Sequence, residues 1–170
     1  MTHSELREQL EKGHVAAFGW ALACCKGNRD EAEDVLHDSY LAVLEGKARF
    51  DARSSFQTWL FGVIRLTAAS ARRKAWLRGL ILERQNGVHN PEAAVQPDSG
   101  LDATSRGEHL RSLLHSLSER QRQVLHLVFY QELSIEEAAS AMGVSLGSAR
   151  THYARGKTNL EKLLDGDRDL

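Results

Sequence analysis

Two long stretches of helical periodicity, separated by a short segment of small polar residues, constrain the fold of this chain more than any other feature of its sequence. The first stretch covers about residues 4–85 and the second about residues 108–164. The segment between them holds Pro91 and Pro97, the only prolines, and few large apolar residues, which is typical of a linker. No useful length of sequence alternates between apolar and polar residues as a strand would. The sequence therefore predicts an all-α fold of two small helical domains, at 1–85 and 108–170, joined by a flexible linker at 86–107.

The net charge of −1 limits how this chain could bind nucleic acid. A uniformly basic surface is excluded, so any DNA-binding interpretation depends on local clusters of charge. The first residues are charged and have no apolar core, which argues against a signal peptide. No apolar run approaches the roughly 20 residues that a membrane span needs. We therefore expect a cytoplasmic protein with no membrane insertion.

The residue types that usually carry catalysis are not arranged for it. No P-loop, glycine-rich fingerprint or nucleophile–base constellation is present, and the eight histidines are scattered. Cys24 and Cys25 are neighbours, and because adjacent residues make a strained disulfide, reduced and partly buried thiols are the simpler interpretation. A redox-sensing or metal-ligating role for the two cysteines is the alternative. The sequence predicts a protein that is not an enzyme and that binds no metal or cofactor.

The second helical stretch carries the signals of two capped helices joined by a tight turn. Ser134 is a suitable N-cap with Glu137 at the capping-box position, and Gly143 follows where a left-handed backbone suits glycine. Ser145 then caps another helix, with Ser148 in its first turn. A helix, a glycine turn and a second capped helix are typical of a helix-turn-helix, whose second helix enters the major groove of DNA.

One face of this second helix is basic and carries small residues, which suits a DNA groove. Arg150, Ala154 and Lys157 share a face by their spacing, and Thr151 and Arg155 lie alongside. Arginine can bind both phosphates and guanine edges. A solvated basic face on an ordinary helical hairpin is the alternative. The predicted DNA-binding residues of this helix are Ser145, Ser148, Arg150, Thr151, His152, Ala154, Arg155 and Lys157.

The first helical stretch contains an acidic amphipathic helix. Its apolar residues, from Val35 to Leu44, line one face, and Glu33, Asp34 and Asp38 lie around that face. Such an acidic surface is either simply solvated or a docking surface for a basic partner.

The next helix begins with large apolar residues around Phe56 and Trp59 and then becomes basic. Its basic residues are Arg65, Arg72, Arg73, Lys74 and Arg78. Trp76 interrupts this run, and basic side chains with an aromatic one suit single-stranded or melted DNA, through phosphate neutralisation and base stacking. A cationic helix end that is favoured by the helix dipole is the alternative.

The helix-turn-helix block resembles region 4 of the extracytoplasmic-function (ECF) sigma factors, a group of the sigma-70 family. Leu117–Arg122, Ser134–Ala139 and Gly143–Ala149 match three motifs of that region in order and spacing. The resemblance implies that this domain binds the −35 promoter element. Ser118 stands where the family commonly has proline. His152 stands where arginine is frequent, and this second change would weaken a phosphate contact or alter the sequence preference.

The acidic helix and the Phe56–Leu60 block resemble two motifs of sigma region 2. The resemblance implies that the acidic helix docks on the β′ clamp helices of core RNA polymerase, and that the loop and basic helix after it capture the melted −10 element. Leu66 and Ser70 stand where the family often has Asn and Asp, which affects the base that is read there. The implied polymerase-binding residues are Glu33, Asp34, His37 and Asp38. The implied −10 DNA-binding residues are Lys47, Arg49, Phe50, Arg53, Arg65, Arg72, Arg73 and Lys74.

Both resemblances in one chain, without the domain 3 that larger sigma factors place between them, imply a sigma factor that directs core RNA polymerase to specific promoters. The implied partners are core RNA polymerase, through its β′ clamp helices and β flap, promoter DNA and an anti-sigma factor. The alternative is a LuxR-type helix-turn-helix regulator that never joins the polymerase, because such output domains share part of the region 4 pattern. Region 2 distinguishes the two, since a regulator of that type has no need for it.

Overall fold

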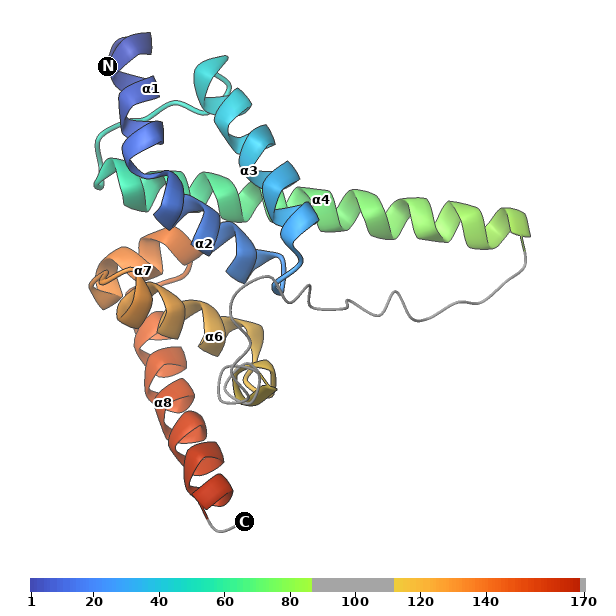
Figure 1. Ribbon diagram of the computed structural model, residues 1–170, viewed down its shortest axis with the longest axis vertical. Helices are drawn as coiled ribbons and strands as arrows, with labels where there is room; N and C mark the ends of the chain where they lie inside the picture. Colours follow the sequence, from blue (N-terminus) through green and yellow to red (C-terminus); the bar gives the residue numbers. More distant parts are fainter. Residues whose placement is uncertain (87–111, 169–170) are drawn as a thin grey trace. The chain divides into compact units, whose positions relative to one another are not determined.

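A computed structural model of the protein describes residues 1–86 and 112–168 of its 170. Within these ranges every regular element is a helix, which confirms the all-α prediction (Figure 1). The predicted linker at 86–107 lies outside the described residues, apart from Asn86.

The chain forms two compact units, and each is described by itself. Of the described residues, the first unit comprises 1–50 and 63–86, and the second comprises 51–62 and 112–168. The helices of the first unit are α1 (His3–Lys12), α2 (His14–Cys24), α3 (Arg29–Leu44) and most of α4 (Phe56–Asn86), which begins in the second unit. The helices of the second unit are α6 (Glu119–Leu125), the π-helix η1 (His126–Tyr130), α7 (Ile135–Met142) and α8 (Leu146–Arg168). The predicted domain boundaries at 85 and 107 stay predictions.

Side-chain caps fix where the first helices begin. Thr2 and Glu5 form a reciprocal capping box at the start of α1, with the Glu5 backbone N–H donating to Thr2 Oγ1 over 3.2 Å. Asn28 Oδ1 accepts from the backbone N–H of Glu31 over 3.1 Å and so starts α3. The core of this unit includes Trp20, which is completely buried on α2. The caps and this core together set the position of α3, the acidic helix of the sequence analysis.

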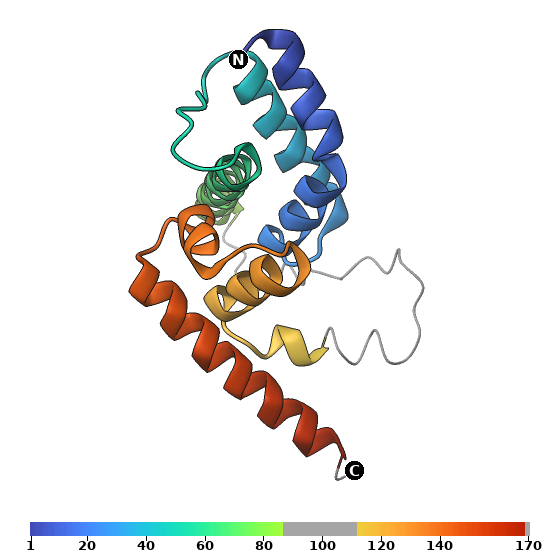
Figure 2. The same cartoon turned by 90° about the vertical axis from the view of Figure 1, so that its left-hand side faces the viewer.

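In the second unit, α8 packs against α6 (Figure 2). A Cβ atom on Gly156 would lie 3.2 Å from Leu125 Cδ1 and 3.3 Å from Gln121 Cβ, which is tighter than ordinary van der Waals contact. Asn159 adds a hydrogen bond across the same crossing, from its Nδ2 to Gln121 Oε1 over 3.2 Å. A larger residue at position 156 would therefore require the side chains of Leu125 and Gln121 to shift by a few tenths of an ångström.

The π-helix η1 is a feature that the periodicity did not predict. The sequence pattern indicates a regular helix there, with Val128 on its apolar face. In the structure Leu127 is completely buried, whereas Val128 is only half-buried. The wider π turn shifts the helical register, and a run that is almost wholly apolar does not reveal this by its spacing.

His126, at the start of η1, makes the stability of the protein sensitive to mild acid. Burial lowers the pKa of His126 to about 4, whereas the unfolded chain has the ordinary value near 6.5. Between these values the unfolded chain binds a proton that the folded chain does not, so the free energy of unfolding falls as pH falls from 6.5 toward 4. We expect a loss of about 1–2 kcal/mol between pH 7 and pH 5 from this group.

Urea denaturation of the wild-type protein and of His126→Gln at both pH values tests this expectation. The variant should lose less stability on acidification, because it has no group at position 126 that protonates. An equal pH dependence in the two proteins would contradict the assignment to His126.

Candidate nucleic-acid interface

The helix-turn-helix has the local geometry that its sequence predicts. The Ser134 backbone N–H donates to Glu137 Oε2 over 2.9 Å, and the Glu137 N–H donates to Ser134 Oγ over 3.2 Å. Gly143 ends α7 with φ 64°, in the left-handed region. The Ser148 N–H donates to Ser145 Oγ over 3.1 Å, which caps α8. The predicted caps and the predicted turn are therefore confirmed.

Arg120 and Arg122 of α6 each bind a backbone carbonyl, and sequence reasoning did not identify either contact. Arg120 Nη1 donates to the Met142 carbonyl over 3.2 Å, so it ties α6 to the C-terminal end of α7. Arg122, in the first of the region 4 motifs, donates from Nη1 to the Leu117 carbonyl over 3.3 Å. A guanidinium that satisfies the free carbonyls of a helix end stabilises the turn that follows. The spacing of residues in the sequence does not indicate which carbonyl either arginine binds.

The outer surface of α8 brings together the residues that the sequence predicts to bind DNA. Ala149 is completely buried and marks the inner face, and His152 lies half-buried at the edge. Lys157 Nζ lies 5.1 Å from the centroid of the Tyr153 ring, which orients its ammonium group. The exposed members of the predicted set are Ser145, Ser148, Arg150, Thr151, Ala154, Arg155 and Lys157. A helix with three exposed cations and small residues between them can approach DNA phosphates and base edges.

The acidic residues of α3 form one exposed face. The side chains of Val35, Leu36 and Val43 are buried, whereas the four predicted polymerase-binding residues are exposed. These four residues are Glu33, Asp34, His37 and Asp38. Glu33 accepts from Arg29 Nε over 3.0 Å, and no ion pair within the described residues includes Asp34 or Asp38. This face therefore has unpaired carboxylates that a basic partner could bind.

In the loop between α3 and α4, two of the predicted DNA-binding cations form ion pairs with neighbouring carboxylates. Lys47 Nζ lies 2.6 Å from Glu45 Oε2, and this hydrogen bond raises the pKa of Lys47. Arg53 Nε lies 3.1 Å from Asp51 Oδ2, so it too has a local partner. Such exposed pairs are screened by solvent and contribute little to stability, so a phosphate could displace them. Arg49 is exposed and Phe50 is half-buried in the same loop.

Arg72, Arg73 and Lys74 of α4 are all exposed, and Arg72 also makes a contact within the fold. Arg72 Nη1 donates to the carbonyl of Cys24 over 3.0 Å, so it joins α4 to the C-terminal end of α2. Arg65 is half-buried, whereas Arg73 and Lys74 are exposed. Trp76, next to them, is 64% exposed. The structure therefore supports Arg73 and Lys74 as accessible cations and gives Arg72 a packing role that its sequence position does not indicate.

The two positions that depart from the region 2 pattern lie on the surface of α4. Leu66 is 59% exposed, and Ser70 is exposed one helical turn later. An exposed leucine contributes little to the core. A side chain at either position is therefore available to a ligand.

The two cysteines are buried. Neither forms a disulfide, and burial raises the pKa of the Cys25 thiol to about 11, so it stays protonated near neutral pH. No group of three or more His, Cys, Asp or Glu side chains in the described ranges could hold a metal ion. The interpretation of the cysteines as small buried hydrophobic residues is thereby favoured.

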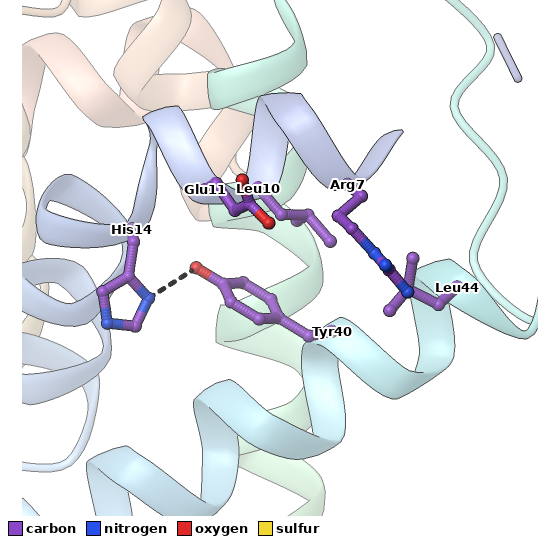
Figure 3. Close-up of a pocket in the computed structure, with 6 residues that line it drawn as sticks. All are labelled: Arg7, Leu10, Glu11, His14, Tyr40 and Leu44. Carbon is purple, nitrogen blue, oxygen red and sulfur yellow. Dashed lines mark hydrogen bonds between the residues drawn. The ribbon is translucent and has the colours of Figure 1, made fainter. Parts of the chain in front are cut away.

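A shallow pocket of about 500 Å³ lies between α1 and α3, and sequence reasoning did not find it (Figure 3). His14 Nδ1 and the Tyr40 hydroxyl form a hydrogen bond of 3.2 Å at one end of it, and burial raises the pKa of Tyr40 to about 12. The residues that line the pocket are Arg7, Leu10, Glu11, His14, Tyr40 and Leu44. Tyr40, which belongs to a region 2 motif, thus joins the start of α2 to α3.

Family comparisons cover both parts of the chain. The model described as Sigma-70 region 2 matches residues 12–78, and the model described as Sigma-70, region 4 matches residues 108–160. None of the helices in the described residues has the length and apolar character of a membrane span.

Curated relatives and a solved structure agree with these matches. The chain is 30% identical to RNA polymerase sigma factor YlaC of Bacillus subtilis, over 82% of this chain and 81% of that protein. It is 31% identical to ECF RNA polymerase sigma factor EcfG of Rhodopseudomonas palustris, over 92% of this chain and 83% of the relative. Its fold is similar to that of the sigma factor RpoE from Bartonella quintana, solved with the anti-sigma factor NepR, with a TM-score of 0.71, 24% identity, and coverage of 95% and 97% of the two chains. The protein belongs to the ECF group of the sigma-70 family of RNA polymerase sigma factors.

Proposed function

We propose that this protein directs core RNA polymerase to specific promoters and catalyses no reaction itself. The observation that carries the proposal is the presence of region 2 and region 4, in this order, in one chain that spans most of the length of its sigma factor relatives. An ECF sigma factor acts with the polymerase, so we expect the protein to work in the cytoplasm.

The charged surfaces suggest which helix binds the polymerase and which helices bind promoter DNA. The acidic face of α3 binds the β′ clamp helices of the polymerase, with Asp34 and Asp38 as its unpaired carboxylates. Arg73 and Lys74 of α4, with the cations of the loop before it, bind the melted −10 strand. The outer face of α8 binds the −35 duplex, where Arg150 and the neighbouring cations contact phosphates and bases. A net charge near zero fits this division, because a strong positive excess would favour indiscriminate DNA binding.

Run-off transcription in vitro tests the proposal directly. Core RNA polymerase is mixed with the purified full chain and a library of promoter sequences, and the transcripts are sequenced. We expect transcription to start at a defined subset of the library only when the chain is present. If the start sites are the same with and without the chain, the proposal is wrong.

The LuxR-type alternative is not supported. Residues 12–78 match region 2, a domain that a regulator with no polymerase contact does not need. Both curated relatives described above are named as sigma factors. Co-purification of the chain with core polymerase distinguishes the two functions independently of any promoter.

An anti-sigma factor is the partner that we propose for the free protein. The RpoE structure with a similar fold was solved with the anti-sigma factor NepR. A protein partner of this kind would hold the chain away from the polymerase until it is released.

Leu66→Asn should change which −10 sequences are used, without a loss of stability. The side chain is exposed, so the substitution should alter the free energy of unfolding by less than about 0.5 kcal/mol. An amide there can hydrogen-bond a base edge, which leucine cannot, and we expect a shift of roughly tenfold in preference at one −10 position. The run-off library measures it. Leu66→Ala is the control, since it removes the leucine without adding an amide, and identical preferences for the two variants would contradict the assignment.

A further inference from the structure

Two aromatic side chains of the π-helix η1 are exposed, and only one of them reaches toward α8. Phe129 is 63% exposed and Tyr130 is 73% exposed. The Phe129 ring stacks on Tyr153 of α8, with 5.9 Å between the ring centroids and 25° between the planes. The Tyr130 ring stacks on His126 within η1 itself, over 5.1 Å. Phe129 therefore connects η1 to α8, whereas Tyr130 stacks inside its own element.

The Tyr153 ring also holds a cation. Lys157 Nζ lies 5.1 Å from its centroid, at the i, i+4 spacing that brings side chains together on a helix. Stacked rings attract each other, and the face of an aromatic ring attracts an ammonium group. A continuous set of contacts thus runs from Phe129 through Tyr153 to Lys157. Phe129 and Tyr153 are here named the aromatic support.

The aromatic support determines the direction in which Lys157 points. Glu161 is an exposed carboxylate four residues after Lys157, and an ion pair with it would turn the ammonium toward the C-terminal end of α8. No ion pair within the described residues includes Lys157, and its ammonium lies at Tyr153 instead. Tyr153 is about 6 Å nearer than Lys157 to the N-terminal end of α8, where Arg150 lies. The ammonium therefore points toward the proposed DNA-binding end of the helix.

We propose that the aromatic support positions Lys157 to bind a phosphate of the −35 duplex, which makes Phe129 and Tyr153 positioning residues of that interface. A free lysine side chain must be ordered when it binds, which weakens affinity by a factor of roughly two to ten. A side chain that is already held in place avoids much of this loss. The inference rests on the proposed function, because it concerns the duplex that α8 binds. Phosphates carry no sequence information, so the support strengthens binding to all −35 sequences alike.

The π turn gives independent support, because it is the element that carries Phe129. Such turns are rare within helices and frequently lie at functional sites. In η1 the side chain of Leu127 is completely buried, and Phe129, two residues later, lies on the outside against Tyr153. An exposed phenylalanine contributes little to the core. Its stacking on Tyr153 therefore accounts for its position better than core packing does.

A protein partner is another ligand that exposed aromatic side chains can bind. Such a partner would contact the more exposed Tyr130 as well as Phe129. The aromatic support uses Phe129 alone, because only this ring stacks on the side chain that holds Lys157. Tyr130→Leu is therefore a matched control for Phe129→Leu, since both variants remove an exposed ring from η1.

Nuclear magnetic resonance of the free full chain tests the positioning without polymerase or DNA. The lysines are labelled with carbon-13, and the Lys157 signal is identified by its disappearance in Lys157→Arg. We expect the ring current of Tyr153 to shift the ε-CH2 protons of Lys157 upfield. This shift should decrease in Phe129→Leu and persist in Phe129→Tyr, which keeps an aromatic ring. It should equal the wild-type shift in Tyr130→Leu.

Binding of a labelled −35 duplex at several salt concentrations tests the phosphate contact, with the chain in complex with core RNA polymerase. Lys157→Gln should lower the salt dependence of log affinity by about one, because one phosphate contact is lost. Phe129→Leu should weaken affinity by roughly twofold to tenfold without a change in that slope, since the contact still forms in the bound state. The double variant should bind no more weakly than Lys157→Gln, because the support acts only through Lys157. Phe129→Tyr should restore the wild-type affinity.

Several results would overturn the inference. One is a Lys157 signal with no upfield shift, and another is affinity losses that add in the double variant. If Phe129→Tyr binds as weakly as Phe129→Leu, Phe129 only stabilises the fold. Equal losses in Phe129→Leu and Tyr130→Leu would assign the exposed rings to a protein partner. The proposed function fails if the wild-type chain gives no defined start sites, whereas this inference fails with those start sites intact.

Discussion

Asp34→Arg is expected to weaken the affinity of the protein for core RNA polymerase by roughly 100-fold, because reversal of a charge that pairs with a basic partner costs several kcal/mol at an interface. Asp34 is exposed on α3 and has no ion-pair partner among the described residues, so the substitution removes no internal contact. Asp34→Asn, which removes the charge without reversing it, should cost less. Titration of the labelled chain with core polymerase, followed by anisotropy, gives the three dissociation constants.

Glu161→Arg is the matched control for this reversal. It changes the net charge of the chain by the same amount, from an exposed position on α8 in the second unit. Its affinity for core polymerase should equal that of the wild-type chain. An unchanged affinity in Asp34→Arg, or an equal loss in the control, would mean that α3 is not the docking face.

Arg150→Ala should reduce transcription from the cognate promoter by about tenfold or more, since one good arginine contact with a base is worth about 1–3 kcal/mol of discrimination. The side chain is exposed, with Ala149 rather than Arg150 on the buried side of α8. The free energy of unfolding should therefore change by less than about 0.5 kcal/mol. Run-off transcription and urea denaturation of the same preparation measure the two quantities.

Lys162→Ala provides the comparison for Arg150→Ala on the same helix. Lys162 is exposed but lies three turns further along α8, outside the predicted DNA-binding set. Transcription should be nearly unchanged in this variant. If Arg150→Ala leaves transcription untouched, or if both variants lose the same amount, the face of α8 that enters the groove is a different one.

The parts of the structure that follow local rules could be predicted from the sequence. Ser134, Glu137, Gly143 and Ser145 act within four residues of their own helix ends, so their spacing is sufficient to identify the caps and the turn. The acidic face of α3 also follows from its periodicity, since one side of an amphipathic helix must be buried.

Features that depend on distant partners could not be predicted. Arg72 reaches the Cys24 carbonyl across 48 positions, and no spacing rule indicates such a contact. The pocket between α1 and α3 likewise needs the packing of two helices that the sequence only predicts one at a time. The π turn at η1 changes the register within an almost wholly apolar run, where every register buries apolar atoms. The preferred −10 and −35 sequences depend partly on how easily each DNA sequence bends and unstacks when it is bound. That energy belongs to the DNA, so the spacing of residues in the protein does not predict it.

The close crossing at Gly156 distinguishes the outer residues of α8, which can be redesigned, from the inner residues, which position the helix. Since α8 is aimed by a contact on its inner side, the residues on its outer side can be exchanged as a set while the angle of the helix stays the same. Transplanting the outward residues of another sigma factor onto this helix should therefore retarget it to that factor's promoters. A transplant that also replaced the glycine would add a Cβ atom against Leu125 and Gln121, and the crossing would then have to adjust together with the new outer residues.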